Sequence, residues 1–320
     1  MSPIVDRLAL IGVGLIGGSI ARAAREYGVA RTIVATARSE ATRKRVVELG
    51  IADQVVDTNA EAAKDADLVI VCIPVGASGP VAQEIAESLK PGAIVSDVGS
   101  VKGAVLKDMA PHIPKGVHLI PAHPVAGTEN SGPDSGFAEL FVNRWCILTP
   151  PEGADAAAVE KLNAFWSALG ANVEVMTAEH HDMVLAITSH LPHLIAYTIV
   201  GTAEEFSTVS RSEVLKFSAG GFRDFTRIAA SDPTMWRDVF LHNKDAVLEM
   251  LAQFSEDLAK LPRAMRRGDG DTLFDHFTRT RAIRRGIVQI GQDSAAPDFG
   301  RPHPAKVLDP LPRPYAADQD

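Results

Sequence analysis

Short runs of consecutive apolar residues alternate with amphipathic segments over the first half of the chain. Continuous apolar runs are typical of strands buried on both faces of a sheet, and the segments between them have helical spacing. The pattern therefore predicts an α/β fold with a mostly parallel, doubly wound sheet. The expected strands lie at residues 8–11, 31–36, 68–73, 93–96, 117–120, 145–148 and 173–175.

Beyond these strands the remaining pattern is helical. Asp232-Pro233 is a typical helix start, and apolar positions at helical spacing follow it as far as Pro262. A last helix is expected from about Asp271 to Ile290. Because the tail that follows is rich in proline, we expect it to be extended over a surface or disordered. The predicted organisation is an α/β domain at 1–177, an all-α domain at 178–290 and a proline-rich tail at 291–320.

One apolar run, Met183–Gly201, is nearly long enough to span a bilayer, which takes about 20 residues. It contains Ser189, His190 and Pro192, so we expect a buried core or interface helix there and not a membrane span. The N-terminus has no basic region followed by an apolar region, so no secretory signal is expected.

Composition and charge limit the classes of partner that the protein is expected to bind. The 320 residues are 46% hydrophobic and 22% charged, which is typical of a globular protein. A formal net charge of -8 disfavours nucleic acid and a polybasic membrane contact. Cys72 and Cys146 lie in apolar runs, which indicates buried, reduced thiols. We therefore expect a cytoplasmic protein with neither nucleic acid nor membrane as a partner.

A glycine-rich turn follows the first expected strand and opens a helix. Gly12, Gly14 and Gly17 form the pattern G-x-G-x-x-G, with Leu15 and Ile16 inside it. The first glycine permits the tight turn, the second lets the backbone approach a pyrophosphate, and the third allows close helix–strand packing. The helix N-terminus then offers unpaired N–H groups to the phosphates. This context predicts a dinucleotide-binding domain.

The end of the second strand bears on the choice between NAD and NADP. An acidic residue that binds the ribose of NAD is expected there, but the chain has Ala37, followed by Arg38 and Ser39. An arginine beside a hydroxyl suits a 2′-phosphate, so NADP is favoured over NAD. The alternative is that Arg38 stacks on adenine or caps the next helix while NAD is bound.

Other chemistry-bearing residues follow the later strands. Ligands of doubly wound sheets bind at the carboxyl ends of the strands. Ile73 and Pro74 are therefore expected beside the nucleotide, as are Asp97 and Ser100 after the fourth strand and His123 after the fifth.

Five motifs occur in the order of one known family, and with them the chain from residue 8 to about 290 resembles the prephenate dehydrogenases, which include arogenate and cyclohexadienyl dehydrogenases. The motifs are SDVGSVK at 96–102, HPVAGTE at 123–129, SHLPH at 189–193, GGFRDFTRIA at 220–229 and DPTMW at 232–236. The resemblance implies a dinucleotide domain followed by a helical domain that forms a homodimer. It also implies oxidative decarboxylation of prephenate or arogenate in tyrosine biosynthesis, with hydride transfer to NAD(P).

The reacting groups implied by the resemblance suit this chemistry. Hydride departure requires the substrate's ring hydroxyl to gain alkoxide character, and a neutral imidazole can accept its proton. By resemblance His123 is that base, and Ser100 bonds the same hydroxyl or orients the histidine. The alternatives are that His123 only packs near a turn and that Ser100 only caps the helix from Val101.

The substrate carboxylate points to arginine, whose planar fork binds carboxylates in a bidentate manner. By resemblance Arg227 has this role and His193 faces the substrate side chain. Asp224 lies three residues before Arg227, on the same face if the segment is helical, and is a candidate either to bind substrate or to orient Arg227. We expect His190 to be structural, and no metal site from these two histidines, because further ligands are lacking.

Three more residues are assigned to the pocket. By resemblance Thr128 and Glu129 line or gate it, although a solvated Glu129 is an alternative, and Trp236 either closes it or packs. His180-His181 lies between acidic residues and is predicted to be a solvated polar turn.

Two rival functions are a β-hydroxyacid dehydrogenase and a catalytically silent nucleotide sensor. The first uses a lysine and an asparagine one helical turn apart, but here Asn243 and Lys244 are adjacent. A silent sensor would not need His123, Ser100 and Arg227 together. The sequence does not separate prephenate from arogenate, which differ only in a keto or amino group on the side chain.

Overall fold

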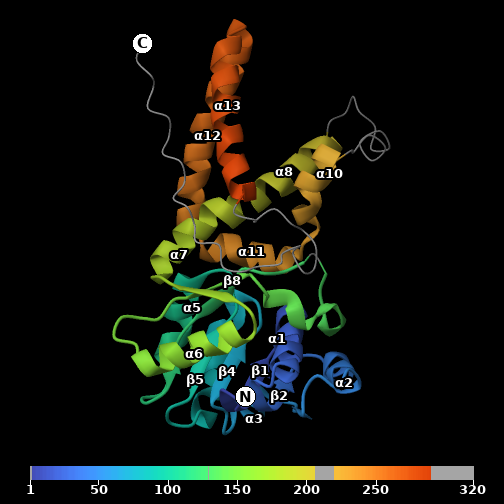
Figure 1. Ribbon diagram of the computed structural model, residues 1–320, viewed down its shortest axis with the longest axis vertical. Coiled ribbons are helices and arrows are strands. Elements are labelled where there is room, and N and C mark those ends of the chain that lie inside the picture. Colours follow the sequence, from blue (N-terminus) through green and yellow to red (C-terminus); the bar gives the residue numbers. More distant parts are fainter. Residues whose placement is uncertain (1, 129, 206–219, 290–320) are drawn as a thin grey trace. The chain divides into compact units, whose positions relative to one another are not determined.

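The computed structural model describes residues 2–128, 130–205 and 220–289. Contacts within the chain divide it into two compact units, residues 1–251 and 252–320, and each is described by itself. The first unit contains both sheets of the protein and most of its helices (Figure 1).

A parallel six-stranded sheet forms the centre of the first unit, with the order β3-β2-β1-β4-β5-β6. The predicted doubly wound fold is confirmed. The sequence pattern did not reveal the short, partly exposed β3. The strands are β1 Val5–Ile11, β2 Ala30–Thr36, β3 Gln54–Val55, β4 Leu68–Val71, β5 Ile94–Asp97 and β6 His118–Leu119.

Helices cover both faces of this sheet and form two apolar cores. Alternate side chains of β1 enter different cores: Leu8 and Leu10 face one, while Ala9 and Ile11 face the other. Full burial of each large aliphatic side chain contributes about 1.5–3 kcal/mol. Helices α1 Leu15–Glu26, α2 Glu40–Glu48 and α6 Ala156–Ala168 contribute to the first core, and α3 Asn59–Ala63, α4 Ser78–Ile85 and α5 Lys102–Met109 to the second. Short 3-10 turns cover Val75–Ala77, Ala86–Ser88, Ala110–His112, Pro133–Ser135, Ala138–Phe141 and Arg227–Ala230.

The sequence pattern suggested that the last strands continue the first sheet. They form a second sheet instead. It contains β7 Ala122–Pro124, β8 Trp145–Leu148 and β9 Asn172–Val175. β7 and β8 are antiparallel, with His123 opposite Ile147, and β8 and β9 are parallel. His118 and Ile120 donate to the backbone of β5, but the next donor in phase, Ala122, gives its N–H to the Asp97 side chain, and the ladder between β5 and β6 ends there.

The residues after β9 that the structure describes, 176–205 and 220–289, are mainly helical, as predicted, but two helix limits differ. The single helix expected from Pro233 to Pro262 is broken at Asn243, whose φ of −112° ends α11. Pro262 lies inside the following helix and does not end it. The helices are α7 Ala178–Leu185, a π-helical turn at Ala186–His190, α8 Leu191–Glu205, α10 Gly220–Thr226, α11 Pro233–His242 and α12 Lys244–Arg267.

One continuous helical run, Ala178–Glu205, is long and apolar enough by length and composition to cross a membrane. Core helices of other proteins pass the same test, so this is weak evidence by itself. Exposed apolar side chains along the run include Met183, Ile187, Ile199 and Val200.

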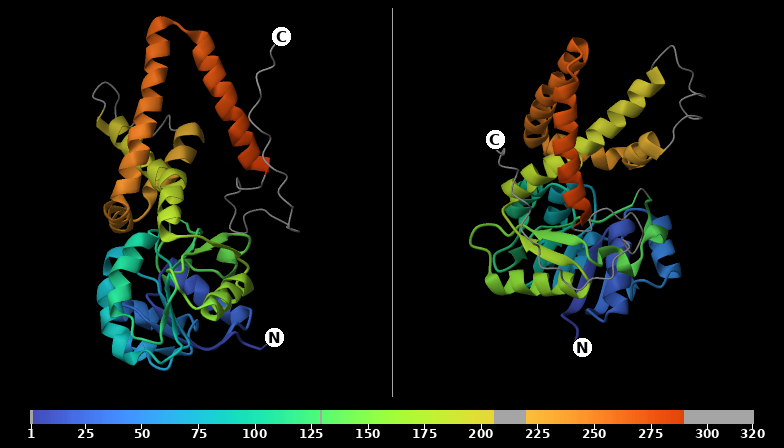
Figure 2. Two further views of the ribbon diagram at one scale, coloured as in Figure 1. Left: turned by 90° about the vertical axis from the view of Figure 1, so that its left-hand side faces the viewer. Right: turned by 45° about the horizontal axis from the view of Figure 1, so that its top comes forward.

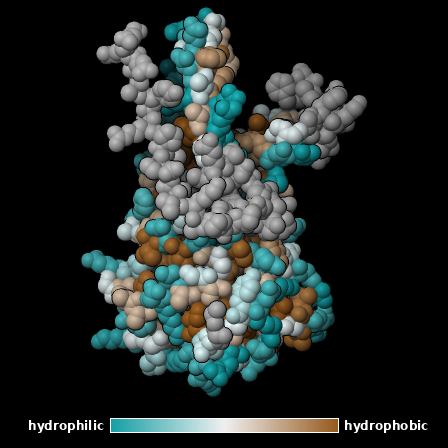
Figure 3. Space-filling model, viewed as in Figure 1, coloured by the Kyte–Doolittle hydropathy of each residue, from teal (hydrophilic) through white to brown (hydrophobic). Residues whose placement is uncertain are grey.

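The second unit contains the end of α12 and helix α13, Gly270–Gln289. The two helices diverge from a turn at Gly268, which has a φ of +65° (Figure 2). Helix α13 agrees with the prediction for residues 271–290. Apolar and polar residues are mixed along the exposed helices in Figure 3, with exposed Phe274, Phe277, Ile283 and Ile287 on α13. The tail at 291–320 lies outside the described residues, and the boundaries at 177/178 and 290/291 stay predictions.

Candidate active site

The glycine turn between β1 and α1 has the geometry of a dinucleotide cradle. Gly12 has a φ of +94°, and a Cβ there would lie 2.5 Å from the Cys72 carbonyl oxygen. A Cβ at Gly17 would lie 2.2 Å from the Gly12 carbonyl oxygen. No atom lies within 4 Å of a Cβ built at Gly14, the N-cap of α1. The open space at this position and the helix N-terminus behind it fit a pyrophosphate.

Strand register brings the predicted cofactor residues to one edge. Ile11 lies opposite Val71, which lies opposite Asp97 on β5. Ile73 follows β4 and approaches the glycine turn, since its Cγ2 would be 2.8 Å from a Cβ at Gly12. Pro74 is exposed beside it, and Leu15 and Ile16 open α1 half-buried.

At the end of β2, Ser39 and not Arg38 caps the next helix. The Ser39 hydroxyl accepts the Thr42 N–H at 3.1 Å. Arg43 donates to the Ala37 carbonyl at 2.7 Å and pairs with Asp57 at 3.1 Å. The Arg38 side chain is exposed, and no ion pair or hydrogen bond joins it to the described residues.

A buried ion pair connects this edge with the second sheet. Lys102 Nζ lies 2.5 Å from Asp97 Oδ2 and donates to the Ala122 carbonyl at 2.7 Å. Asp97 also accepts the N–H groups of Gly99 and Ala122. Burial raises the pKa of Asp97 and lowers that of Lys102, while their mutual attraction opposes both shifts. Both carboxylate oxygens of Asp97 are therefore engaged within the protein, where they hold β7 against β5.

His123, the predicted base, is buried on β7 with 7% of its surface exposed. Its Nδ1 lies 2.8 Å from Nε2 of His181, and the rings meet edge to face with centroids 5.1 Å apart. His181 is fully buried at the start of α7. The prediction of a solvated polar turn is therefore wrong for His181 and correct for His180, which is exposed.

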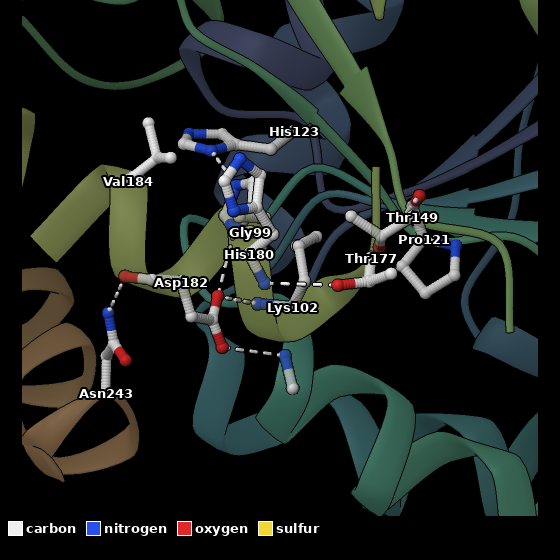
Figure 4. A network of polar contacts seen from close by, with 12 residues as sticks. Gly99, Lys102, Pro121, His123, Thr149, Thr177, His180, Asp182, Val184 and Asn243 are labelled. Carbon is white, nitrogen blue, oxygen red and sulfur yellow. Dashed lines mark hydrogen bonds and ion pairs between the residues drawn. The ribbon is translucent and has the colours of Figure 1, made fainter. Parts of the chain in front are cut away.

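Asp182 continues the row of polar groups. Its Oδ1 accepts from His181 Nδ1 and from the Lys102 N–H, both at 2.8 Å, and its Oδ2 accepts from the Gly103 N–H at 2.9 Å. Burial acts to raise the pKa of Asp182, but these hydrogen bonds lower it below its ordinary value. The carboxylate thus caps α5. Figure 4 shows Asp182 between His123 on one side and Asn243 on the other.

Asn243 ties the same segment to a further histidine. Its Nδ2 donates to the Asp182 carbonyl at 2.8 Å and lies 3.0 Å from His190 Nδ1. His190 is fully buried, in agreement with a structural role. Burial lowers its pKa to about 4. A π-helical turn at Ala186–His190 ends at the first histidine of the SHLPH motif. Pro192 lies between the two histidines in the first turn of α8, which is a regular α-helix there, so the helix is distorted before His190 and not between the histidines as expected.

His193 and Trp236 form a stacked pair, with ring centroids 3.6 Å apart. His193 Nδ1 donates to the Ser189 carbonyl at 2.8 Å, so Nε2 is the ring nitrogen left to contact a ligand. Burial and nearby Arg227 lower the pKa of His193, and the Ser189 carbonyl opposes this shift. Trp236 is buried, and its Nε1 has no hydrogen-bond partner among the described residues. This indole therefore packs against a predicted substrate-binding residue.

The other predicted pocket residues are more exposed. Arg227 begins a 3-10 turn that packs on α8, and its charge acts on His193. Asp224, on α10, is paired with Arg223 at 2.9 Å. The Thr128 hydroxyl accepts the Asn130 N–H at 3.2 Å. Glu129 lies outside the described residues.

Ser100 is half-buried beside α5, but it is not the cap of that helix. Val101 is the N-cap residue, and the first N–H groups bind Asp182. The hydroxyl of Ser100 makes no hydrogen bond to the described residues, whereas its backbone acts on His190. The capping alternative for Ser100 is therefore wrong.

Burial lowers the pKa of His123 well below its ordinary value, and the neighbouring His181, Lys102 and His190 lower it further. Burial also lowers the pKa of His181, although Asp182 opposes this shift. Both imidazoles are therefore neutral near pH 7, as a proton acceptor requires.

Sequence reasoning missed His181, Asp182, Asn243 and Lys102. The missed signal was helical phase: Ala178, His181, Asp182 and Leu185 form one buried face of α7. Lys102 and Asp97 both belong to the motif at 96–102, but Lys102 also donates to Ala122, which follows 20 residues later on β7, and this contact could not be read from the motif.

Comparison with known proteins identifies the family. Residues 20–175 match the model for the prephenate dehydrogenase nucleotide-binding domain, and residues 177–279 match that for the prephenate dehydrogenase dimerization domain. A cyclohexadienyl dehydrogenase of Zymomonas mobilis is 44% identical over 89% of this chain and 97% of its own length. A prephenate dehydrogenase of Bacillus subtilis is 33% identical over 93% of this chain and 80% of its own.

Solved structures agree. Prephenate dehydrogenase from Aquifex aeolicus, in complex with hydroxyphenyl propionate and NAD+, has a TM-score of 0.82 and 32% identity, covering 88% of this chain and 98% of that one. Arogenate dehydrogenase from Synechocystis has a TM-score of 0.73 and 26% identity, covering 87% and 99%. The dimerization domain supports self-association, and the nucleotide-binding domain supports NAD(P) use. The chain belongs to the prephenate dehydrogenase family, and it is an NAD(P)-dependent oxidoreductase of tyrosine biosynthesis.

Proposed function

We propose that this enzyme oxidatively decarboxylates both prephenate and arogenate, that it prefers NADP, and that His123 is its base. The observation that carries this proposal is the placement of His123. Its Nδ1 is bonded to His181, so Nε2 is the nitrogen that faces a substrate. Ala122, its neighbour, is bonded to Asp97, and strand register connects Asp97 to the glycine turn.

His123 Nε2 accepts the proton of the substrate's ring hydroxyl. A dinucleotide held at the glycine turn of Gly12, Gly14 and Gly17 would supply the acceptor for the hydride that leaves the hydroxyl-bearing carbon. The electron pair of the breaking bond to carbon dioxide enters the ring, which becomes aromatic, and His123 returns its proton to the phenolic oxygen. The histidine is thus unchanged after a turnover. Ser100 is proposed to donate a hydrogen bond to the same oxygen.

Arg227 and His193 support recognition of the rest of the substrate. Arg227 lies close enough to His193 to lower its pKa, and a guanidinium suits a carboxylate. Trp236 holds the His193 ring by stacking. Asp224, Thr128 and Glu129 are proposed to line the pocket. Acceptance of both substrates rests on the similarity to the cyclohexadienyl dehydrogenase of Zymomonas mobilis.

The preference for NADP rests on the end of β2. Ala37 replaces the acid that would repel a 2′-phosphate, and the exposed Arg38 is not engaged by the described residues. The Ser39 hydroxyl is already used to cap α2. We therefore propose that Ser39 favours a bound phosphate by placing the N-terminus of α2 there, and not through its own hydroxyl. Arg38→Ala is expected to raise the KM for NADP by about tenfold, the loss of one charge-assisted contact, and to leave that for NAD nearly unchanged.

We also propose a cytoplasmic homodimer. The exposed apolar side chains of 178–205 lie within the matched dimerization domain, where a second copy would cover them. Sedimentation as a monomer at micromolar concentration would contradict this.

The decisive experiment is absorbance at the reduced-nicotinamide band with prephenate and arogenate, each offered with NAD and NADP. We expect turnover of both substrates, faster with NADP at low cofactor concentration. Turnover with NAD alone would overturn the cofactor preference. No turnover with any pair, from folded protein that binds nucleotide, would favour the silent sensor.

A further inference from the structure

A row of three buried side chains leads from the proposed base to a helix end. His123, His181 and Asp182 are joined by two contacts of 2.8 Å, and each is at most 9% exposed. They come from β7 and α7, which are separated by β8, α6 and β9 in the chain. Only His123 belongs to a motif from which a catalytic role was expected.

The contacts determine where each proton lies. The Asp182 carboxylate accepts N–H groups from Lys102 and Gly103 at its two oxygens, and these bonds favour the ionised form by lowering its pKa. His181 Nδ1 must then carry a proton to donate to Asp182. In the neutral ring its Nε2 is a bare acceptor, so the proton in the contact with His123 belongs to His123 Nδ1. This leaves His123 Nε2 with its lone pair.

We propose that His181 and Asp182 are positioning residues that hold His123 in the tautomer with a basic Nε2 and stabilise the imidazolium formed during turnover. The catalytic part of this inference rests on the proposed function. When Nε2 takes the substrate's proton, the positive charge on His123 faces His181, whose other nitrogen is bonded to a carboxylate. The Nδ1 proton is drawn toward His181 Nε2 and returns when Nε2 releases its proton, so no net proton is stored.

Asp182 is held in place from two further directions. The first two N–H groups of α5 fix its oxygens, and Asn243 donates to its carbonyl at 2.8 Å. Space around the carboxylate is tight, because a Cβ at Gly103 would lie 2.9 Å from Asp182 Oδ2. The carboxylate therefore orients His181 and cannot swing away from it at low energetic cost.

The charges around His123 make such stabilisation useful. His181 approaches it from α7, Lys102 from α5 and His190 from the π-helical turn, and each would disfavour a positive charge on His123. Lys102 is balanced by Asp97 in its own buried pair. Asp182 is the carboxylate connected to His123 through hydrogen bonds, and its removal should make His123 a weaker base.

The tautomer can be measured without any substrate. In protein labelled with 15N-histidine, the signal lost in His123→Asn identifies His123. We expect a protonated Nδ1 and a bare Nε2 near pH 7. We expect the same tautomer in His181→Gln, whose amide oxygen can accept the Nδ1 proton, and a shift toward the other tautomer in His181→Phe. A His123 that carries its proton on Nε2 in the wild type would overturn the proposal, whatever the enzyme's reaction is.

Kinetics test the second half of the proposal. His181→Phe is expected to lower kcat by about 10²-fold, the lower limit for loss of effective general base catalysis, with little change in cofactor KM. His181→Gln should recover part of this loss. His180→Phe is the matched control, because it changes the exposed neighbour in the same helix turn, and it should behave as wild type.

Asp182→Asn separates charge from shape. Without the carboxylate, the acid limb of the kcat–pH profile should move to lower pH, because protonated His123 loses its stabilisation. The double variant His181→Phe/Asp182→Asn should lose little more than the worse single variant, since the residues act as one unit. A drop in kcat of equal size at every pH, with additive losses in folded protein that binds NADPH, would show a merely structural role and overturn the proposal.

Discussion

The glycine turn of Gly12, Gly14 and Gly17 and the row of His123, His181 and Asp182 lie at the same edge of the parallel sheet, but the sequence encodes them in different ways. The glycine turn is a local structure, because Gly12, Gly14 and Gly17 are close in sequence. A Cβ would clash with the backbone at Gly12 and Gly17, and Gly14 leaves open space. The row of His123, His181 and Asp182 exists only after two sheets and a helix have formed. A local motif can be recognised from sequence, whereas an assembled one requires the fold.

The largest expected effect is on the assembled region. His123→Asn should keep cofactor binding, because the glycine turn does not depend on the imidazole, and should lower kcat by about 10²–10⁴-fold. Initial rates and NADPH fluorescence titration measure the two properties separately. Normal turnover in this variant would eliminate His123 as the base.

Lys102→Met tests the connection between the two regions. It leaves Asp97 as an uncompensated buried charge, which typically costs about 3–5 kcal/mol of unfolding free energy. Denaturant unfolding would measure the loss. Adding Asp97→Asn should recover much of it, and a loss below about 1 kcal/mol for the single variant would contradict a buried ion pair here.

Gly12→Ala tests the local region. A positive φ and a Cβ 2.5 Å from the Cys72 carbonyl oxygen should together cost about 3 kcal/mol and weaken NADPH binding. Gly14→Ala is the matched control for stability, because its Cβ meets no atom within 4 Å. If the two variants melted at the same temperature, the glycine at position 12 would not be required by sterics.

The smallest effect is a pH dependence of stability from buried histidines, a kind of residue that the glycine turn of Gly12, Gly14 and Gly17 does not contain. Burial lowers the pKa of His123, His181 and His190 in the folded state, the last to about 4. In the unfolded chain each takes up a proton near about pH 6.5. The unfolded state then binds more protons, so the unfolding free energy should fall below about pH 6.5, by up to about 1.4 kcal/mol per pH unit for each histidine.

Denaturant unfolding at several values between about pH 7.5 and pH 5 would measure this slope. His123→Asn should make it shallower, since one titrating group is removed. An unchanged slope would show that His123 is not held neutral by folding. The lowered pKa of Asp182 acts at still lower pH: the stability it contributes is present above about pH 3.9 and is lost as the pH falls through its folded pKa.

The same division explains what the sequence could and could not predict. Continuous apolar runs predicted the parallel strands, and local motifs predicted the glycine turn and the start of α11, while the role of His123 stays a prediction. The second sheet was missed because its strands have the same local pattern as those of the first. His181 was misassigned because its neighbours Glu179, His180 and Asp182 are polar, while its burial is decided by β7 and α5, which contact it through space.

The π-helical turn at Ala186–His190 has a consequence for the spacing of the SHLPH motif. An α-helix advances by 100° per residue, so one extra residue in a turn changes the direction in which every later side chain points. Because His190 ends this turn and His193 follows it, the offset sets the direction of both side chains relative to α7, so that His190 faces Asn243 and His193 stacks on Trp236. Deleting a single residue from the turn would restore a regular helix and rotate His193 away from the indole. The length of this segment is therefore as much a part of the site as the identity of its histidines.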